Sequence, residues 1–283
     1  MRLPERFPRD VAAVACDLDR TLTWEDGALR PRTTAALQAA RSAGIHVVIA
    51  TGRMYRSVLP YAQAVGIETP LVCYQGAAVV DPKTGDWLLH EPIPLELARE
   101  AIGAVEDAGF GLNCYVDDDL CVAAITDNAR AYADFQSIPL HEVGPLLDWI
   151  ERPPTKLVVV DDPDRLDVLR PRLEERFGER LFIAKSLPYF LELASPAISK
   201  GTGLAFVAGQ LGFAAEHTVA FGDGENDLEL LEWAGFAVAV ENAHDGLKAR
   251  ADWICPGAAD EGVAQVLEAL LEGLAERRSL PGP

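Results

Sequence analysis

The chain has 283 residues, 49% of them hydrophobic and 24% charged, which is typical of globular proteins and excludes a disordered, collagen-like or coiled-coil chain. Its formal charge of -19 disfavours sequence-independent binding to nucleic acid or to an anionic membrane surface. No apolar run approaches the ~18 residues of a membrane span, and the run at residues 11–16 is too short for a signal-peptide core. We expect a cytoplasmic protein that binds neither nucleic acid nor membrane.

The first third of the chain alternates apolar runs with helical patterns. Three of the runs lack polar alternation and predict buried strands, at residues 11–16, 45–50 and 71–74. Two helices are predicted between them, each followed by a glycine, at residues 33–43 and 54–65. The last third repeats this pattern, with strands at 218–221 and 237–240 and helices at 202–211, 227–233 and 262–274. Strands that alternate with helices predict βαβ units and a parallel sheet.

The middle of the chain has a different pattern. A helix is predicted at residues 95–108, followed by a hairpin with strands at 112–116 and 120–125. Three further strands and a helix are predicted after it, at residues 157–160, 181–184, 190–193 and 163–177. The predicted fold is therefore α/β, with a Rossmann-like parallel-sheet core of residues 1–84 and 190–283 and an inserted α+β domain at 85–189. The tail at 277–283 is expected to be frayed.

Two carboxylates, Asp17 and Asp19, follow the first predicted strand. At this spacing they leave the strand on the same face, where two anions are unfavourable unless a cation or a shared proton compensates them. A Mg²⁺ ion would do so, because it binds carboxylate oxygens and keeps phosphate and water as its other ligands. One carboxylate would then act as a nucleophile and the other as a general acid and base. The alternative is a solvated turn at a strand end.

Two further clusters suit a phosphate group. Thr51, Gly52 and Arg53 follow the second strand and begin a helix, whose first N–H groups bind phosphate readily. The alternative for this cluster is a simple helix cap. Lys200 stands before another helix and offers a compact positive charge to a phosphoryl oxygen. The alternative for Lys200 is a lysine on the surface.

A fourth cluster runs from Gly222 to Asp227, after the strand at residues 218–221. Asp223 stands where a metal ligand would lie beside the first cluster, and Asn226 and Asp227 belong to the loop and the first turn of a helix. An acidic turn that caps this helix is the alternative. All four clusters stand at the carboxyl ends of predicted core strands, where open α/β sheets place their ligands.

In this order and at these spacings, the four clusters resemble the motifs of the haloacid dehalogenase superfamily of phosphatases. The chain is most similar to the Cof-type branch, in which a type IIB cap domain is inserted between the second and third motifs. Further matching segments stand at residues 74–76, 188–193, 242–243 and 261–263. The resemblance covers almost the whole chain and implies that the insert closes over the site and selects the substrate.

The resemblance implies a role for each residue of the clusters. Asp17 would be the nucleophile that forms an aspartyl-phosphate, and Asp19 would be the general acid and base. Mg²⁺ would bind to the Asp17 carboxylate, the Asp19 backbone carbonyl and Asp223. The phosphoryl group would be bound by Thr51, Gly52, Lys200 and Asn226. Asp227 would orient Lys200 or the water ligands of the metal.

Some positions depart from the pattern of the family. Arg20 stands where the family usually has glycine, so it is strained if the loop needs a positive φ there, or else it points into the cleft and contacts the substrate. Gln75 replaces a commoner asparagine, and Glu241 replaces a commoner glycine. The roles of Arg20 and Arg53 stay open. In the insert, the acidic turn at residues 117–119 is predicted to be solvated.

We expect a Mg²⁺-dependent phosphatase that hydrolyses a small phosphorylated metabolite, with sugar phosphates favoured. A phosphomutase or phosphosugar transferase of the same architecture is one alternative, because it would use Asp17 in the same way. A non-catalytic protein that binds a phosphorylated ligand is another alternative, although a pure binder needs no nucleophile. The sequence leaves the substrate and the oligomeric state open.

Overall fold

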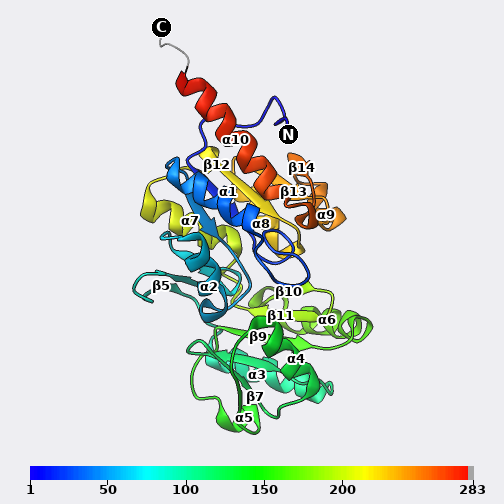
Figure 1. Ribbon diagram of the computed structural model, residues 1–283. Coiled ribbons are helices and arrows are strands. Elements are labelled where there is room, and N and C mark those ends of the chain that lie inside the picture. The colour runs from blue at the N-terminus through cyan, green and yellow to red at the C-terminus, as the bar shows by residue number, and fades with distance from the viewer. Residues whose placement is uncertain (280–283) are drawn as a thin grey trace.

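The computed structural model describes residues 1–279 and shows two bodies, one above the other in Figure 1. The upper body is the core, which is built from both ends of the chain, and the N-terminus and the end of the last described helix lie at its far end. The lower body is the insert, which we call the cap. Residues 277–279 of the predicted frayed tail continue the last helix, and the rest of that tail lies outside the described residues. No described helix is long and apolar enough to cross a membrane.

The core contains the predicted parallel sheet, in the strand order β14-β13-β12-β1-β2. Its strands are β1 (Ala13–Cys16), β2 (His46–Ile49), β12 (Thr218–Gly222), β13 (Phe236–Val240) and β14 (Trp253–Cys255). Every residue of β1, β12 and β13 is buried, which is why these strands are unbroken apolar runs in the sequence. Because Cys16 pairs with Phe221, the residues that follow β1 and β12 leave the sheet side by side.

Helices of the core pack in pairs, α1 with α10 and α7 with α8. The core helices are α1 (Pro31–Ser42), α2 (Tyr55–Val65), α7 (Lys200–Leu211), α8 (Leu228–Trp233), α9 (Asp245–Lys248) and α10 (Gly262–Ser279). Ser199 caps α7, because its hydroxyl accepts the N–H of Thr202 at 3.1 Å while the Thr202 hydroxyl accepts the N–H of Ser199 at 2.8 Å. This reciprocal pair fixes the start of α7 and thereby places Lys200 in its first turn.

The cap is a sheet of six strands in the order β10-β11-β9-β6-β7-β8, with four helices. Its strands are β6 (Asn113–Val116), β7 (Asp119–Val122), β8 (Leu140–Glu142), β9 (Lys156–Val160), β10 (Phe182–Leu187) and β11 (Phe190–Ala194). Its helices are α3 (Leu95–Asp107), α4 (Asp127–Gln136), α5 (Leu146–Trp149) and α6 (Pro163–Phe177). The pairing is antiparallel as predicted, except that β8 runs parallel to β7. Helix α4 was not predicted because its sequence is largely polar and small.

The pairing of the strands places both boundaries between core and insert at other residues than the sequence predicted. The third core strand, β3 (Leu71–Cys73), joins the parallel sheet only through a bridge between Ala50 and Val72, and pairs antiparallel with β4 (Ala78–Val80). The next strand, β5 (Trp87–His90), pairs with β4, so it belongs to the core rather than to the predicted insert. Conversely, β11 lies between β10 and β9, so it belongs to the cap rather than to the predicted core. In each case one partner is a neighbour in sequence, β4 for β5 and β10 for β11, but an apolar run alone does not show which sheet such a pair joins.

The predicted hairpin turn of the cap is present, and Asp117 is exposed as predicted, but Asp118 is not. Asp118 is 8% exposed, and its carboxylate accepts the N–H groups of Tyr55 and Arg56 at 3.1 Å each and the hydroxyl of Tyr74 at 2.7 Å. Those N–H groups belong to the first turn of α2, which has no side-chain cap of its own. Asp118, a residue of the cap domain, therefore accepts the free N–H groups at the start of helix α2 in the core. This contact holds the two bodies together.

Replacing Asp118 by alanine should lower the free energy of unfolding by about 1–2 kcal/mol, because it leaves two helix N–H groups and a buried hydroxyl without their acceptor. Urea denaturation would measure this change. Asp117→Ala is the matched control, since Asp117 and Asp118 both have positive φ values, 52° and 60°, but within residues 1–279 Asp117 pairs only with an exposed arginine, Arg152. Equal losses in the two variants would contradict the capping role of Asp118.

Candidate active site

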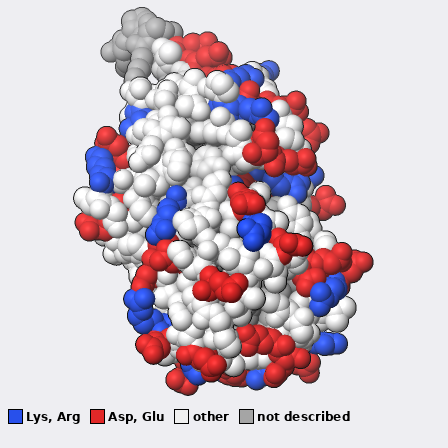
Figure 2. Space-filling view, turned by 60° about the horizontal axis from the view of Figure 1, so that its bottom comes forward, with Lys and Arg blue, Asp and Glu red and all other residues white. Residues whose placement is uncertain are grey.

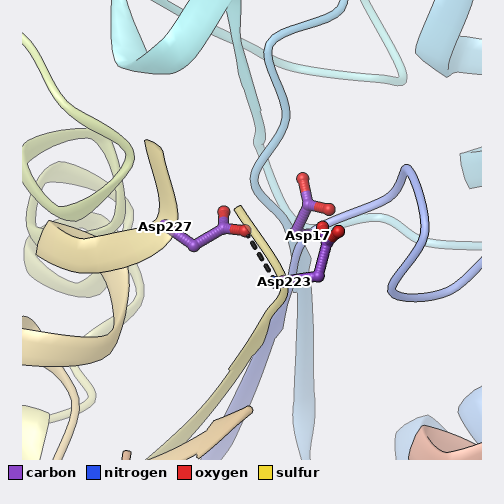
Figure 3. A group of neighbouring side chains, drawn as sticks. All are labelled: Asp17, Asp223 and Asp227. Atoms are coloured by element: carbon purple, nitrogen blue, oxygen red, sulfur yellow. Dashed lines mark hydrogen bonds between the residues drawn. The ribbon is translucent and has the colours of Figure 1, made fainter. Parts of the chain in front are cut away.

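Three aspartates from two of the clusters meet at the end of the parallel sheet. Asp17 and Asp223 follow the neighbouring strands β1 and β12, and Asp227 faces them from the short turn before α8, as Figure 3 shows. One carboxylate oxygen of each lies within 4.8 Å of the other two. A group of oxygen ligands this compact suits a hard divalent cation. The predicted convergence of Asp17 and Asp223 is therefore present, and Asp227 joins them.

Lys200 joins two of these aspartates from the start of α7. Its buried Nζ donates to Oδ1 of Asp17 and to Oδ1 of Asp227, at 2.6 Å each. The other oxygen of Asp227 accepts the N–H groups of Asp223 and Gly224 at 2.9 Å each. Both oxygens of Asp227 are thus engaged within the protein, so Asp227 positions Lys200 and the Asp223 loop. A side chain at Gly222 would clash with this arrangement, because a Cβ there would lie 2.6 Å from Cβ of Asp227.

The charges of the cluster shift its pKa values. Burial and the negative charge of Asp227 raise the pKa of Asp17 well above its usual range, against the opposing effect of Lys200. Burial and Asp227 likewise raise the pKa of Asp223, to about 7. Burial alone would lower the pKa of Lys200, but Asp17 and Asp227 raise it above its ordinary value. Three carboxylates around one ammonium therefore leave a deficit of positive charge, and this fits a site that binds a cation.

The raised carboxyl pKa values predict how the stability of the metal-free protein depends on pH. In the unfolded chain these groups lose their protons near pH 4, whereas folded Asp223 keeps its proton to about pH 7. The folded state therefore binds more protons in this window, so the free energy of unfolding in EDTA should fall as the pH rises from about 4 to about 7. Asp223→Asn should flatten this profile in urea titrations, and Asp245→Asn, at a fully exposed site, should leave it unchanged. Parallel profiles for wild type and Asp223→Asn would contradict the assignment.

Asp19 lies beside the cluster and is bound by Arg53. The guanidinium donates to both carboxylate oxygens, with Nε 2.9 Å from Oδ2 and Nη2 2.7 Å from Oδ1. Arg53 is itself buried, donates to Ser57 and Tyr61, and lies over the ring of Phe135. The structure thus gives Arg53 a definite contact that the sequence left open, and it fixes the orientation of the Asp19 carboxylate. The Mg²⁺ contact of the Asp19 backbone carbonyl stays a prediction.

Of the four predicted phosphate-binding residues, only Gly52 and Asn226 line the cavity at the site. Gly52 and Asn226 line a small cavity of about 30 Å³, together with Asp17, Asp19 and Asp223. Thr51 is fully buried, and its hydroxyl accepts the N–H of Arg53 at 3.1 Å. Because α2 begins only at Tyr55 and has no side-chain cap of its own, this contact is not the helix cap of the alternative interpretation. Lys200 reaches the cluster through Asp17, as described above. Phosphate binding by these four residues stays a prediction.

Residues 14–267 match the model of the haloacid dehalogenase-like hydrolase family. The chain belongs to this family. It is 29% identical to the pyridoxal phosphate phosphatase of Escherichia coli, over 90% of this chain and 96% of that protein. It is 28% identical to a 5-amino-6-(5-phospho-D-ribitylamino)uracil phosphatase of Bacillus subtilis, over 90% of this chain and 96% of that protein. A crystal structure of a Thermotoga maritima protein is 32% identical and has a TM-score of 0.79, covering 91% of this chain and 97% of that one.

The predicted membership of the superfamily is confirmed, and with it the identification of the chain as a phosphatase. This haloacid dehalogenase-like hydrolase keeps Asp17, Asp19, Lys200 and Asp223 together at one end of its sheet. The non-catalytic binding protein that the sequence left as an alternative is set aside, because the relatives are enzymes and the buried nucleophile candidate is in place.

A buried polar chain that the sequence did not predict connects the cap of this hydrolase to its site. Asn226 donates to Gln75 at 3.0 Å, Gln75 donates to Glu192 at 2.8 Å, and Lys156 lies 3.3 Å from Glu192. Lys156 also donates to the carbonyl of Gly52 at 2.5 Å. A lysine directly before the apolar residues of β9 was the available sequence signal, but only the fold shows that it is buried and what it pairs with.

Arg20, the position where the family usually has glycine, adopts a φ of 61° in this hydrolase. Its carbonyl accepts the side-chain N–H of Asn242 at 2.8 Å, and its Nε lies 3.7 Å from Oδ2 of Asp223. The left-handed conformation costs a residue with a side chain about 1 kcal/mol relative to glycine. The strain that the sequence predicted is therefore present, and the guanidinium lies next to a candidate metal ligand.

Comparing two variants that both lack the guanidinium would measure this strain. Arg20→Gly should be more stable than Arg20→Ala by about 1 kcal/mol in urea denaturation, because only glycine adopts the positive φ without a steric penalty. At an unstrained site the order would be reversed, since alanine loses less conformational entropy on folding. The reversed order at position 20 would therefore contradict the strain.

Proposed function

We propose that the chain is a Mg²⁺-dependent phosphatase that hydrolyses a small phosphorylated metabolite through an aspartyl-phosphate on Asp17, with sugar phosphates favoured. The observation that carries this proposal is the buried contact of Lys200 with Asp17, next to Asp223 on the neighbouring strand. This arrangement combines a fixed carboxylate nucleophile with a fixed positive charge, which are the parts that phosphoryl transfer needs most.

The contacts of Asp17 suggest how it attacks. Lys200 binds Oδ1, which leaves Oδ2 to form a bond to phosphorus while the bond from phosphorus to the leaving oxygen breaks. Asp19, oriented by Arg53, delivers a proton to the leaving oxygen. In the second half, Asp19 takes a proton from water as the water oxygen attacks phosphorus and releases Asp17 and inorganic phosphate. Lys200 remains close enough to Asp17 to neutralise charge on a phosphoryl oxygen.

A metal ion fits the residues of this site. Asp17 and Asp223 would hold Mg²⁺, with the backbone carbonyl of Asp19 as a further oxygen ligand. The excess of carboxylates over ammonium groups, and the pKa of Asp223 raised to about 7 by burial and by Asp227, agree with this assignment. When bound, the ion supplies positive charge that stabilises the phosphoryl oxygens in the transition state.

The cap limits the size and access of the substrate. Phe135, Gln136, Leu187 and Phe190 of the cap line the small cavity opposite Asp17, so the phosphoryl group would be enclosed away from bulk water. The two phosphatases named above act on chemically different substrates, so neither name transfers to this chain. A small phosphorylated metabolite, with sugar phosphates favoured, remains the class that we propose.

Release of inorganic phosphate from p-nitrophenyl phosphate with Mg²⁺ tests the proposal. Asp17→Asn should lower kcat at least about a thousandfold, since the amide is a poor nucleophile. Asp19→Asn should turn over equally slowly yet bind Mg²⁺ like wild type in calorimetry, because its proposed ligand is the backbone carbonyl. Asp245→Asn controls for loss of a surface charge. Full activity in Asp17→Asn would overturn the mechanism, and phosphate transfer within a sugar without release would indicate a phosphomutase.

A further inference from the structure

A second groove, of about 480 Å³, opens beside the small cavity that holds Asp17. The two share Asp223 from the core and Ser186 and Leu187 from the cap, so they are neighbours across one wall. A phosphoryl group beside Asp17 would therefore direct part of its leaving group toward this groove. The volume is in the range of sites that hold small metabolites.

Three cationic side chains line the groove, and two of them are already paired. Arg170 donates to Glu174 at 2.7 Å and to Glu225 at 3.2 Å, and Lys185 pairs with Asp167. Arg20 differs from both, because no acceptor among residues 1–279 takes a hydrogen bond from its guanidinium, and its Nε is buried without a partner. It forms a long ion pair with Asp223, whose Oδ2 lies 3.7 Å from Nε, which is too far for a hydrogen bond.

Hydrogen bonds hold the backbone of Arg20 in the left-handed conformation, which is strained for a residue with a side chain. Asn242 binds its carbonyl at 2.8 Å, and the same asparagine accepts the N–H of Ala258 at 2.8 Å, so the loop conformation is fixed from outside. The guanidinium lies 5.9 Å from the ring centre of Trp24, which limits its orientations. An arginine whose buried Nε donates no hydrogen bond, held in a strained conformation at the edge of an active site, indicates a function other than stability.

We infer that the substrate carries a second anionic group on its leaving alcohol and that Arg20 binds this group in the groove. This inference rests on the proposed phosphatase function and narrows its substrate class. A guanidinium binds carboxylates and phosphates through paired N–H donors, and a desolvated donor such as Nε of Arg20 gains most from such a partner. A carboxylate and a second phosphate present the same chemistry to Arg20, so the test includes both.

The test compares substrates in matched pairs that differ at the second group. 3-Phosphoglycerate is paired with glycerol 3-phosphate, and fructose 1,6-bisphosphate with fructose 6-phosphate. The measured quantity is the ratio of kcat/KM for the anionic member to kcat/KM for the neutral one, from release of inorganic phosphate. This ratio should be at least about ten in wild type for one of the two pairs. The pair that shows it tells whether the second anionic group of the substrate is a carboxylate or a phosphate.

Variants of Arg20 then assign the preference. Arg20→Gln should lower the ratio by about tenfold, and Arg20→Lys, which keeps a positive charge but loses the paired donors, should lower it less. Because the ratio is taken within one variant, a general loss of activity cancels. Arg170→Gln is the matched control, since it removes a cation of the same groove that is already paired, and its ratio should stay within about twofold of wild type.

The outcomes separate this inference from the proposed function. If wild type hydrolyses neither p-nitrophenyl phosphate nor any of these substrates, the proposed function fails, and the inference fails with it. If wild type is active but its ratios are near one, or if Arg20→Gln keeps the wild-type ratio, only the inference is overturned. An equal loss in Arg170→Gln would assign the preference to the general charge of the groove and would overturn the role of Arg20.

Discussion

The ammonium of Lys200, placed between Asp17 and Asp227, is the interaction on which the rest of the site depends. It joins the start of α7 to the loops after β1 and β12, three segments that are far apart in sequence. Asp227 in turn fixes the loop of Asp223 through two N–H groups. A buried ammonium and a buried carboxylate are costly when alone, so the fold keeps these groups only because they compensate one another.

This arrangement also bears on how a chain with a formal charge of -19 would bind the phosphorylated substrate that we propose. The carboxylates Asp17, Asp223 and Asp227 outnumber the one ammonium group of Lys200, and a cation bound among them would also attract a phosphoryl group. Elsewhere, acidic and basic side chains are interspersed on the face shown in Figure 2, where no continuous basic surface is visible. Net charge therefore describes the surface and gives no information about the ligand of a buried site.

Much of the fold and of the site was predictable from the sequence, because the relevant signals are local. The fully buried strands β1 and β12 are unbroken apolar runs, and the aspartates that follow them must meet wherever the strands are neighbours. The pairing of Arg53 with Asp19 and the burial of Asp118 were not predictable, because each depends on a partner distant in the sequence. The domain boundaries were not predictable for a different reason, because the apolar runs of β5 and β11 do not show which sheet each strand joins.

The chain of hydrogen bonds from Asn226 through Gln75 to Glu192 has a consequence for how this enzyme can be engineered. Glu192 and Lys156 come from the cap, whereas Gln75, Asn226 and the Gly52 carbonyl belong to the core, and all of these side chains are buried. A cap transplanted from a relative would bury its own groups against this core surface. The cap is thus not an independent module, and an exchange of specificity between relatives must carry both sides of this junction together.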